Sequence, residues 1–158
     1  MTQTDSFDDL RDLYQEVILD HGRKPRHARR LEAFDVTAKG DNPMCGDRVQ
    51  VWVKFDADTV GQVGFEARGC AISVASADLM AETVQHRSKS DTKALFEAFR
   101  TLARTGACPD CSADLAEPME RLAPLAGVHE YPSRVKCATL PWHALIAAID
   151  GSKEASSE

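Results

Sequence analysis

The sequence lacks the features that mark membrane, secreted or nucleic-acid-binding proteins. None of its apolar runs approaches the ~20 residues needed to span a bilayer. Its acidic, polar start, MTQTDSFDDLRD, is unlike a secretory signal peptide. Positive charge is not in excess, because 25 Asp and Glu outnumber 19 Lys and Arg and give a net charge of −6. We therefore expect a cytoplasmic protein that binds neither nucleic acid nor membrane.

The chain also lacks internal repeats, and its length of 158 residues suits one domain. Hydrophobic residues make up 43% and charged residues 28%, as in an ordinary globular protein. We expect a single domain at residues 1–150. A disordered tail is expected at residues 151–158, where the sequence reads GSKEASSE.

Hydrophobic patterning predicts a small antiparallel sheet. Residues 48–55 alternate apolar and polar side chains, as in a strand with one buried face. A turn at 56–58 leads to a second strand near 60–67, and a shorter strand near 36–39 completes three strands. Helical spacing predicts helices near 6–21, 73–85, 90–104, 112–125 and 137–149, with Ser90 capping the third and Pro141 in the first turn of the last. The expected fold class is α+β, with several helices packed against a three-stranded sheet.

One segment is strongly basic. Residues 21–30, HGRKPRHARR, hold five Lys or Arg and no acid. Such a run is typical of a solvated loop, but it could also be a docking patch for an acidic protein partner. Both interpretations stay open at the level of sequence.

The chain has five cysteines, at positions 45, 70, 108, 111 and 137. In a reducing compartment they favour metal or sulfur chemistry over a disulfide framework. Cys45 lies in the turn-forming run NPMCGD, with Asp47 two residues later. A nearby carboxylate discourages ionisation of a thiol, so this is a poor setting for a bare nucleophile. A bound divalent cation would instead make both groups ligands.

The predicted hairpin brings two thiols together. Cys45 precedes its first strand, and Cys70, in RGCAIS, follows its second strand and begins a helix, whose N-terminus favours thiolate. Cys137, in RVKCATLPW, has a similar place at the start of the last helix. Three thiolates with the Asp47 carboxylate form a four-coordinate set that suits zinc. Their spacing matches no short zinc-ribbon pattern, however, and free cysteines are often simply buried.

The motifs NPMCGD, GCAISVASADLM and RVKCATLPW, in this order, resemble the three cysteine motifs of the U-type iron–sulfur cluster assembly proteins, the family of IscU, SufU and the NifU N-terminal domain. LYQEVILDHGRKPR resembles the family's N-terminal helix and loop. The resemblance extends to about Ile149. It implies an α+β domain with Cys45, Asp47, Cys70 and Cys137 clustered at one end. It also implies partnership with a pyridoxal-phosphate cysteine desulfurase that hands over persulfide sulfur.

Within this family the chain resembles the zinc-dependent sulfur acceptors (SufU-type) more than the cluster scaffolds (IscU-type). Scaffolds have a histidine directly before the third cysteine, and here that residue is Lys136. The chain reads HEYPSRVK where scaffolds have a proline-rich chaperone motif, and its stretch between Cys70 and Cys137 is longer. The resemblance implies a sulfurtransferase that acts with a SufS-type desulfurase and supplies a SufBCD-type scaffold. The alternatives are a scaffold for an iron–sulfur cluster on the same cysteines and a zinc-stabilised interaction domain.

The expected roles follow from position. Cys45 is the expected sulfur acceptor, because Gly46 lets its loop move, whereas Cys70 and Cys137 are tied to helix starts. Cys137 stays an alternative acceptor. Arg134 and Lys136 could offset the negative charge of the site or contact the partner.

Cys108-Pro-Asp-Cys111 is a C-x-x-C pair outside these motifs. Such a pair can be structural, can form a reversible disulfide, or can supply half a zinc site. A thioredoxin-type motif would follow a strand, and here predicted helices lie on both sides. We treat Cys108 and Cys111 as possible redox residues.

Overall fold

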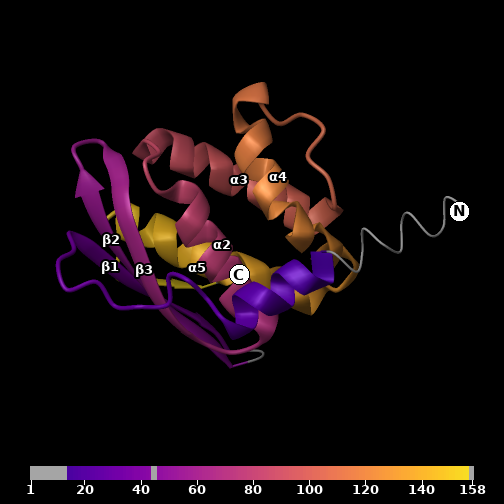
Figure 1. The fold of residues 1–158 in the computed structure, drawn as a ribbon, viewed down its shortest axis with the longest axis horizontal. Coiled ribbons are helices and arrows are strands. Elements are labelled where there is room, and N and C mark those ends of the chain that lie inside the picture. The colour runs from indigo at the N-terminus through magenta and orange to yellow at the C-terminus, as the bar shows by residue number, and fades with distance from the viewer. Residues whose placement is uncertain (1–13, 44–45, 157–158) are drawn as a thin grey trace, which may run out of the picture.

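The computed structural model describes residues 14–43 and 46–156, in which helices pack against a mixed four-stranded sheet (Figure 1). Strands β1 (Val36–Asn42), β2 (Asp47–Asp56) and β3 (Thr59–Arg68) are antiparallel neighbours, as the alternating pattern predicts. Strand β4 (Glu154–Ser156) pairs in parallel with β1, so the sheet order is β3-β2-β1-β4. The α+β class is confirmed, with one more strand than expected.

Strand β4 lies within the segment 151–158, which we expected to be a disordered tail, and gives residues 154–156 a regular structure. Gly151 has a φ of 83°, a left-handed conformation that turns the chain back after the last helix. Lys39 N–H then donates to the carbonyl of Lys153 at 2.8 Å, and pairing continues from Lys39 with Glu154. The edge of β1 thus offers backbone partners to a polar segment that has no hydrophobic pattern of its own.

The helical segments are residues 14–23, α2 (Ala71–Val84), α3 (Lys89–Thr105), η1 (Ala113–Leu115), α4 (Ala116–Leu122), η2 (Ala123–Glu130) and α5 (Pro132–Ile149). Ser88, not Ser90, caps α3, because its hydroxyl accepts the N–H of Asp91 at 3.0 Å. No helix in the described part of the chain is long and apolar enough to cross a membrane.

Helix α5 begins five residues earlier than expected. Pro132 is its first residue, and Pro141 lies inside it rather than in its first turn. An internal proline removes one helical hydrogen bond, so a proline in the sequence is usually taken to mark the end or the start of a helix. Here the helix continues because tertiary packing compensates, since Leu140, Pro141 and Trp142 are all buried. Cys137 consequently lies in the second turn of α5.

The core lies between the sheet and helices α2, α3 and α5. Helix α5 approaches β1 closely, since a Cβ atom added at Gly40 would lie 3.1 Å from a methyl carbon of Leu140. On its other side α5 packs on α3, where the rings of Phe99 and Trp142 stack with centroids 4.8 Å apart.

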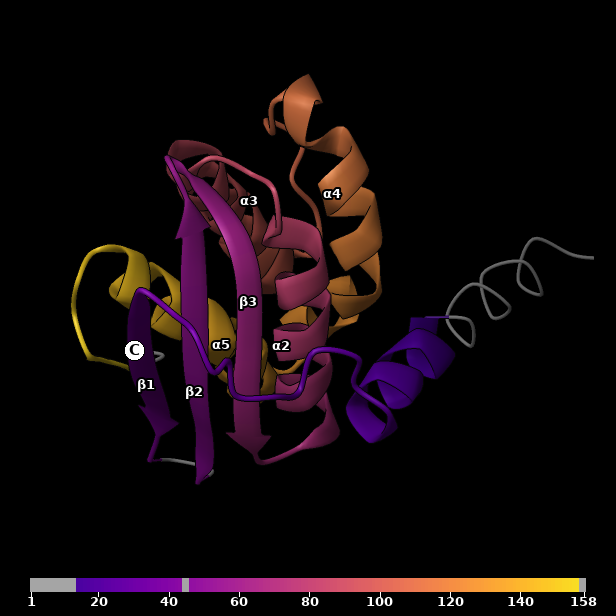
Figure 2. The ribbon, with the colours of Figure 1, turned by 60° about the vertical axis from the view of Figure 1, so that its left-hand side comes forward.

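The segment between residues 23 and 36 covers the opposite face of the sheet, where it passes in front of β2 and β3 (Figure 2). Leu31 is buried there, and the Arg30 guanidinium lies over the ring of Trp52. The backbone of Arg29 is so close to β3 that a Cβ atom at Gly64 would overlap its carbonyl. The basic run is therefore packed by its backbone, while its five cationic side chains are exposed. Its docking role stays a prediction.

Candidate metal centre

Three of the four predicted ligands meet at one end of the sheet. Asp47 is the first residue of β2, Cys70 is the N-cap of α2, and Cys137 lies in α5. One ligand atom from each lies within 4.8 Å of the others. Cys45, the predicted fourth ligand and sulfur acceptor, lies outside the described residues. The sheet and two helices therefore bring together residues that are far apart in the sequence.

Asp47 is the centre of this cluster. Its side chain is buried, with 1% of the residue exposed. Oδ1 accepts the backbone N–H of Cys70 at 3.1 Å, and Oδ2 lies 3.8 Å from the Cys70 sulfur. No Lys, Arg or His in the described part of the chain forms an ion pair with Asp47. Burial of a carboxylate beside two thiols, away from water, has a high free-energy cost unless a bound cation compensates the negative charge.

Gly69 makes room for this carboxylate. A Cβ atom at position 69 would overlap Oδ1 of Asp47. The absence of a side chain therefore lets the end of β3 pass close to the start of β2. This glycine was not singled out from sequence, although its place directly before Cys70 in the RGCAIS run was visible.

Arg134 supplies positive charge to the cluster. Arg134 lies one helical turn before Cys137 on α5, and its guanidinium interacts electrostatically with both thiols. The negative charges of Cys70 and then of Cys137 raise the pKa of Arg134 above its usual range. Lys136 does not lie beside the two thiols. It lines a cleft on another side of α5, together with Arg100 and Arg104 of α3.

The donor set fits a divalent metal ion with sulfur affinity. Two thiols and a carboxylate converge beside the N-terminus of α2. Sulfur-rich sites of this kind suit zinc or the iron of an iron–sulfur cluster.

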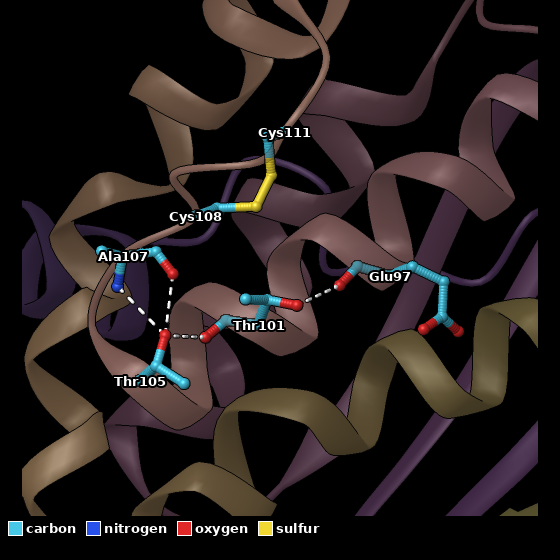
Figure 3. Close-up of a disulfide and its surroundings, with 6 residues drawn as sticks. All are labelled: Glu97, Thr101, Thr105, Ala107, Cys108 and Cys111. Carbon is cyan, nitrogen blue, oxygen red and sulfur yellow. Dashed lines mark hydrogen bonds between the residues drawn. A yellow bond between two sulfur atoms is a disulfide. The ribbon is translucent and has the colours of Figure 1, made fainter.

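The C-x-x-C pair lies elsewhere. Cys108 and Cys111 form a disulfide in the loop after α3, with their Cα atoms 5.4 Å apart (Figure 3). Thr105 stabilises the start of this loop through hydrogen bonds with Ala107. In both ribbon views this loop lies toward α4, away from the lower end of the molecule, where α2 begins (Figures 1 and 2). The pair is thus separate from the Asp47 cluster, and its redox role stays a prediction.

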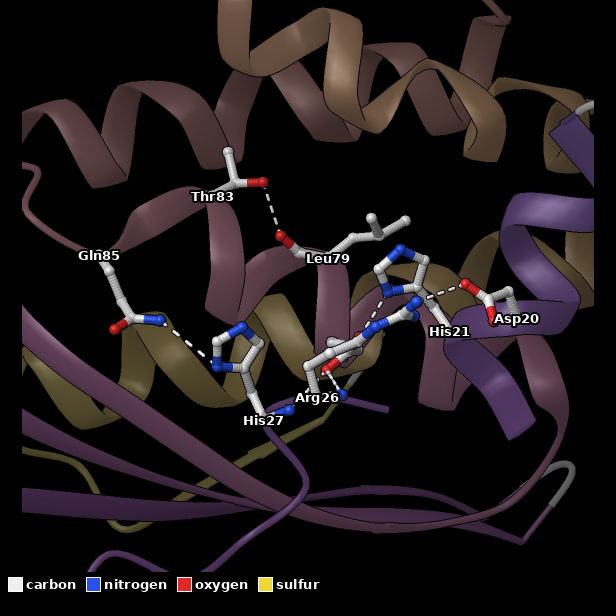
Figure 4. A network of polar contacts seen from close by, with 8 residues as sticks. Asp20, His21, Arg26, His27, Leu79, Thr83 and Gln85 are labelled. Carbon is white, nitrogen blue, oxygen red and sulfur yellow. Dashed lines mark hydrogen bonds and ion pairs between the residues drawn. The ribbon is translucent and has the colours of Figure 1, made fainter. Parts of the chain in front are cut away.

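The basic run is anchored by a buried carboxylate, Asp78, which was not singled out from the sequence. Asp78, in the middle of α2, is fully buried. Its Oδ1 accepts the backbone N–H groups of Arg26 and His27, each at 2.8 Å, and its Oδ2 lies 2.5 Å from Nδ1 of His21 (Figure 4). The available signal was an aspartate within the otherwise small and apolar stretch AISVASADLM, because a buried carboxylate needs partners.

Comparison with known proteins identifies the family of this chain. The model of the NifU-like N terminal domain matches residues 13–138, a range that includes the cysteine of each of the three motifs. The chain belongs to this family. The chain is 36% identical over 146 residues to the iron–sulfur cluster assembly scaffold protein IscU of Streptococcus pyogenes, covering 92% of this chain and 88% of that protein. It is also 36% identical over 133 residues to the zinc-dependent sulfurtransferase SufU of Bacillus subtilis, covering 84% of this chain and 86% of that protein.

Solved structures give the same result for the fold. A putative scaffold for the SUF system from Fervidobacterium islandicum superposes with a TM-score of 0.73 at 30% identity, over 85% of this chain and 94% of that one. A NifU-like protein from Brucella abortus superposes with a TM-score of 0.76 at 21% identity, over 89% of this chain and 94% of that one. At this identity the likeness supports the fold alone. This NifU-like domain is thus a member of the U-type iron–sulfur cluster assembly family. The names of its relatives divide between scaffold and sulfurtransferase.

Proposed function

We propose that this NifU-like domain is a zinc-dependent sulfurtransferase of iron–sulfur cluster biogenesis. It accepts persulfide sulfur from a SufS-type pyridoxal-phosphate cysteine desulfurase, stimulates that enzyme, and supplies a SufBCD-type scaffold. The observation that carries the proposal is the convergence of the buried Asp47 carboxylate with the thiols of Cys70 and Cys137, beside Arg134. The zinc-dependent sulfurtransferase named among its relatives supports the same assignment.

The proposed zinc ligands are Cys45, Asp47, Cys70 and Cys137. Zinc bound there would keep the thiols deprotonated at neutral pH while masking them from other reactants. The buried Asp47 holds the backbone of Cys70 in place, and Gly69 allows its close approach. Three thiolates and a carboxylate around a divalent ion carry a net charge of about two minus, and Arg134 offsets part of it.

Cys45 is the proposed acceptor. Its thiolate attacks the outer sulfur of the enzyme persulfide, so a new S–S bond forms at Cys45 and the S–S bond of the donor breaks. The desulfurase cysteine leaves as a thiolate, and Cys45 carries the transferred sulfur. Arg134 is placed to stabilise the anionic persulfide, because its guanidinium lies at the neighbouring thiols and is exposed toward an approaching partner.

A scaffold function is the second candidate. The Streptococcus relative named a cluster scaffold is as similar as the sulfurtransferase, and cysteine thiolates are also the ligands of iron–sulfur clusters. Lys136 favours the sulfurtransferase, because a protonated lysine cannot replace the histidine that scaffolds have before the third cysteine.

The test is the steady-state rate of the cognate desulfurase on cysteine, with and without the zinc-loaded protein. We expect a saturable stimulation that disappears in Cys45→Ala and persists in the matched double variant Cys108→Ala/Cys111→Ala. Absence of stimulation by the wild-type protein would exclude the sulfurtransferase. Anaerobic reconstitution that then yielded a transferable cluster would establish the scaffold.

A further inference from the structure

A cleft on the far side of α5 from the thiols is lined by basic side chains. Its volume is about 350 Å³, and Arg100, Arg104, His129, Lys136 and His143 all line it. No Asp or Glu is among its lining residues. This concentration of positive charge stands out because the whole chain has a net charge of −6.

Two helix faces create the cleft. Arg100 and Arg104 are four residues apart on α3, so they lie on the same face of that helix. Lys136 and His143 are seven residues apart on α5 and also share a face, whereas Cys137 projects toward Asp47. A ligand in the cleft would therefore not displace the metal ligands.

Packing between the two helices keeps these faces at a fixed distance. The Phe99 and Trp142 rings stack, and the Phe96 ring meets the His143 ring edge-on, with centroids 5.1 Å apart. His129 is also held in place, because its Nδ1 donates to the carbonyl of Ala126 at 2.8 Å and leaves Nε2 for another partner. The cleft is thus built from residues of α3, η2 and α5 rather than from a loop.

The charges in the cleft are poorly compensated. Arg100 contacts Glu97 at 3.3 Å, but in the described part of the chain Arg104 and Lys136 form no ion pair. Arg104 lies in the last turn of α3, where a cation is favoured by the helix dipole. That explanation does not extend to Arg100, Lys136 and His143, which approach the same space from the middle of α3 and from α5.

We propose that this cleft binds a small dianion, a phosphate ester or a dicarboxylate. Guanidinium groups bind both of these groups through paired N–H donors, and Lys136 adds a further donor. The volume lies near the lower limit of small-molecule sites, which begin at roughly 300 Å³. Neither the zinc site nor the sulfur-transfer step is required for this binding.

The experiment is an amide NMR titration of the metal-loaded full chain with sodium phosphate and, in a second arm, with sodium succinate, each against sodium chloride of equal ionic strength. We expect saturable shifts confined to the second half of α3 and to α5 around Lys136. Saturation by phosphate alone identifies phosphate esters, saturation by succinate alone identifies dicarboxylates, and saturation by both supports the shared chemistry. Absence of saturation with both probes would overturn the proposal.

The variants are Arg104→Gln and, as a matched control, Arg23→Gln. Both arginines are exposed and form no ion pair in the described part of the chain, so neither change is expected to unfold the protein. We expect Arg104→Gln to weaken binding about tenfold, as loss of a charge-assisted hydrogen bond would. Arg23→Gln should leave it unchanged. Equal weakening by the two variants would mean an adventitious ion only and would contradict a defined site.

The His143 ring gives an independent readout. Burial and then the positive charge of Arg100 lower the pKa of His143, while Glu97 opposes this effect. Lys136 and His129 line the same cleft. A bound dianion should favour the protonated imidazole and move the midpoint of the ring-proton titration to higher pH. A midpoint that does not change at a saturating probe concentration would contradict binding beside His143.

Discussion

His21 and Asp78, which are 57 positions apart in the sequence, are joined by a contact of 2.5 Å between Nδ1 and Oδ2. Asp78 is fully buried in α2, and its other oxygen accepts the backbone N–H groups of Arg26 and His27. One carboxylate therefore ties both the helix at residues 14–23 and the basic segment after it to the α2 helix. The same α2 helix has Cys70 at its N-terminus, so this anchor and the candidate metal centre share one rigid element.

Asp78→Ala should destabilise the fold substantially. The change leaves the backbone N–H groups of Arg26 and His27, and the ring of His21, without their acceptor. Loss of one partner in a buried polar network of this kind costs about 3 kcal/mol or more. Urea denaturation measures the free energy of unfolding. Asp110→Ala is the matched control, because Asp110 is exposed and forms no ion pair with the residues that the structure describes. An equal, small effect of both variants would contradict the anchoring role.

Gly69→Ala should weaken metal binding. The added Cβ atom would overlap Oδ1 of Asp47, so the carboxylate would have to leave its position beside Cys70. Displacement of a ligand or of its support typically reduces metal affinity by about 10- to 100-fold. Competition with a chromogenic zinc chelator measures this. Gly127→Ala is the control, because in the described part of the chain no atom beyond its own backbone surroundings lies within 4 Å of the added Cβ. Unchanged zinc affinity in Gly69→Ala would refute the Asp47 assignment.

Arg134→Gln and Lys136→Gln should differ in sulfur acceptance, although both remove one positive charge. The guanidinium of Arg134 interacts electrostatically with the thiols of Cys70 and Cys137, whereas Lys136 lines the cleft on another side of α5. We expect Arg134→Gln to reduce desulfurase stimulation by about tenfold, which is the effect of losing roughly one charge-assisted interaction. We expect Lys136→Gln to have little effect on this stimulation. Equal losses would indicate that net charge alone matters.

The stability of the protein should fall below neutral pH in part because of His143. Burial first, and then Arg100, lower the pKa of His143 from its usual 6.5 in the folded state. The unfolded chain therefore takes up a proton at higher pH than the folded chain does. This contribution to stability is complete above about pH 6.5 and is lost as pH falls through the lower, folded-state pKa.

His143→Asn should make the free energy of unfolding less dependent on pH in this acidic range. Urea denaturation at several pH values between neutral and mildly acidic conditions measures the slope. The control is His86→Asn, at an exposed position whose φ of 71° is acceptable to asparagine. The expectation fails if the His143 variant has the same slope as the wild type.

Several features of the site were predictable because they depend on local chemistry. The alternation at 48–55 and the turn after it place the two ends of the hairpin together, which brings Asp47 and Cys70 to one end of the sheet. The position of Cys70 at a helix start was equally visible and is confirmed.

By itself, the sequence determined the α+β class, the three antiparallel strands and the motifs that relate the chain to the iron–sulfur cluster assembly family. Only the tertiary structure decided that β4 joins the edge of β1, that α5 continues through Pro141, that Asp78 is an anchor, and that Arg134 rather than Lys136 lies at the thiols. Periodicity and caps are short-range properties that are written in neighbouring residues. Edge pairing, compensation for an internal proline and the partners of a buried carboxylate depend on residues distant in sequence, which only packing brings into contact.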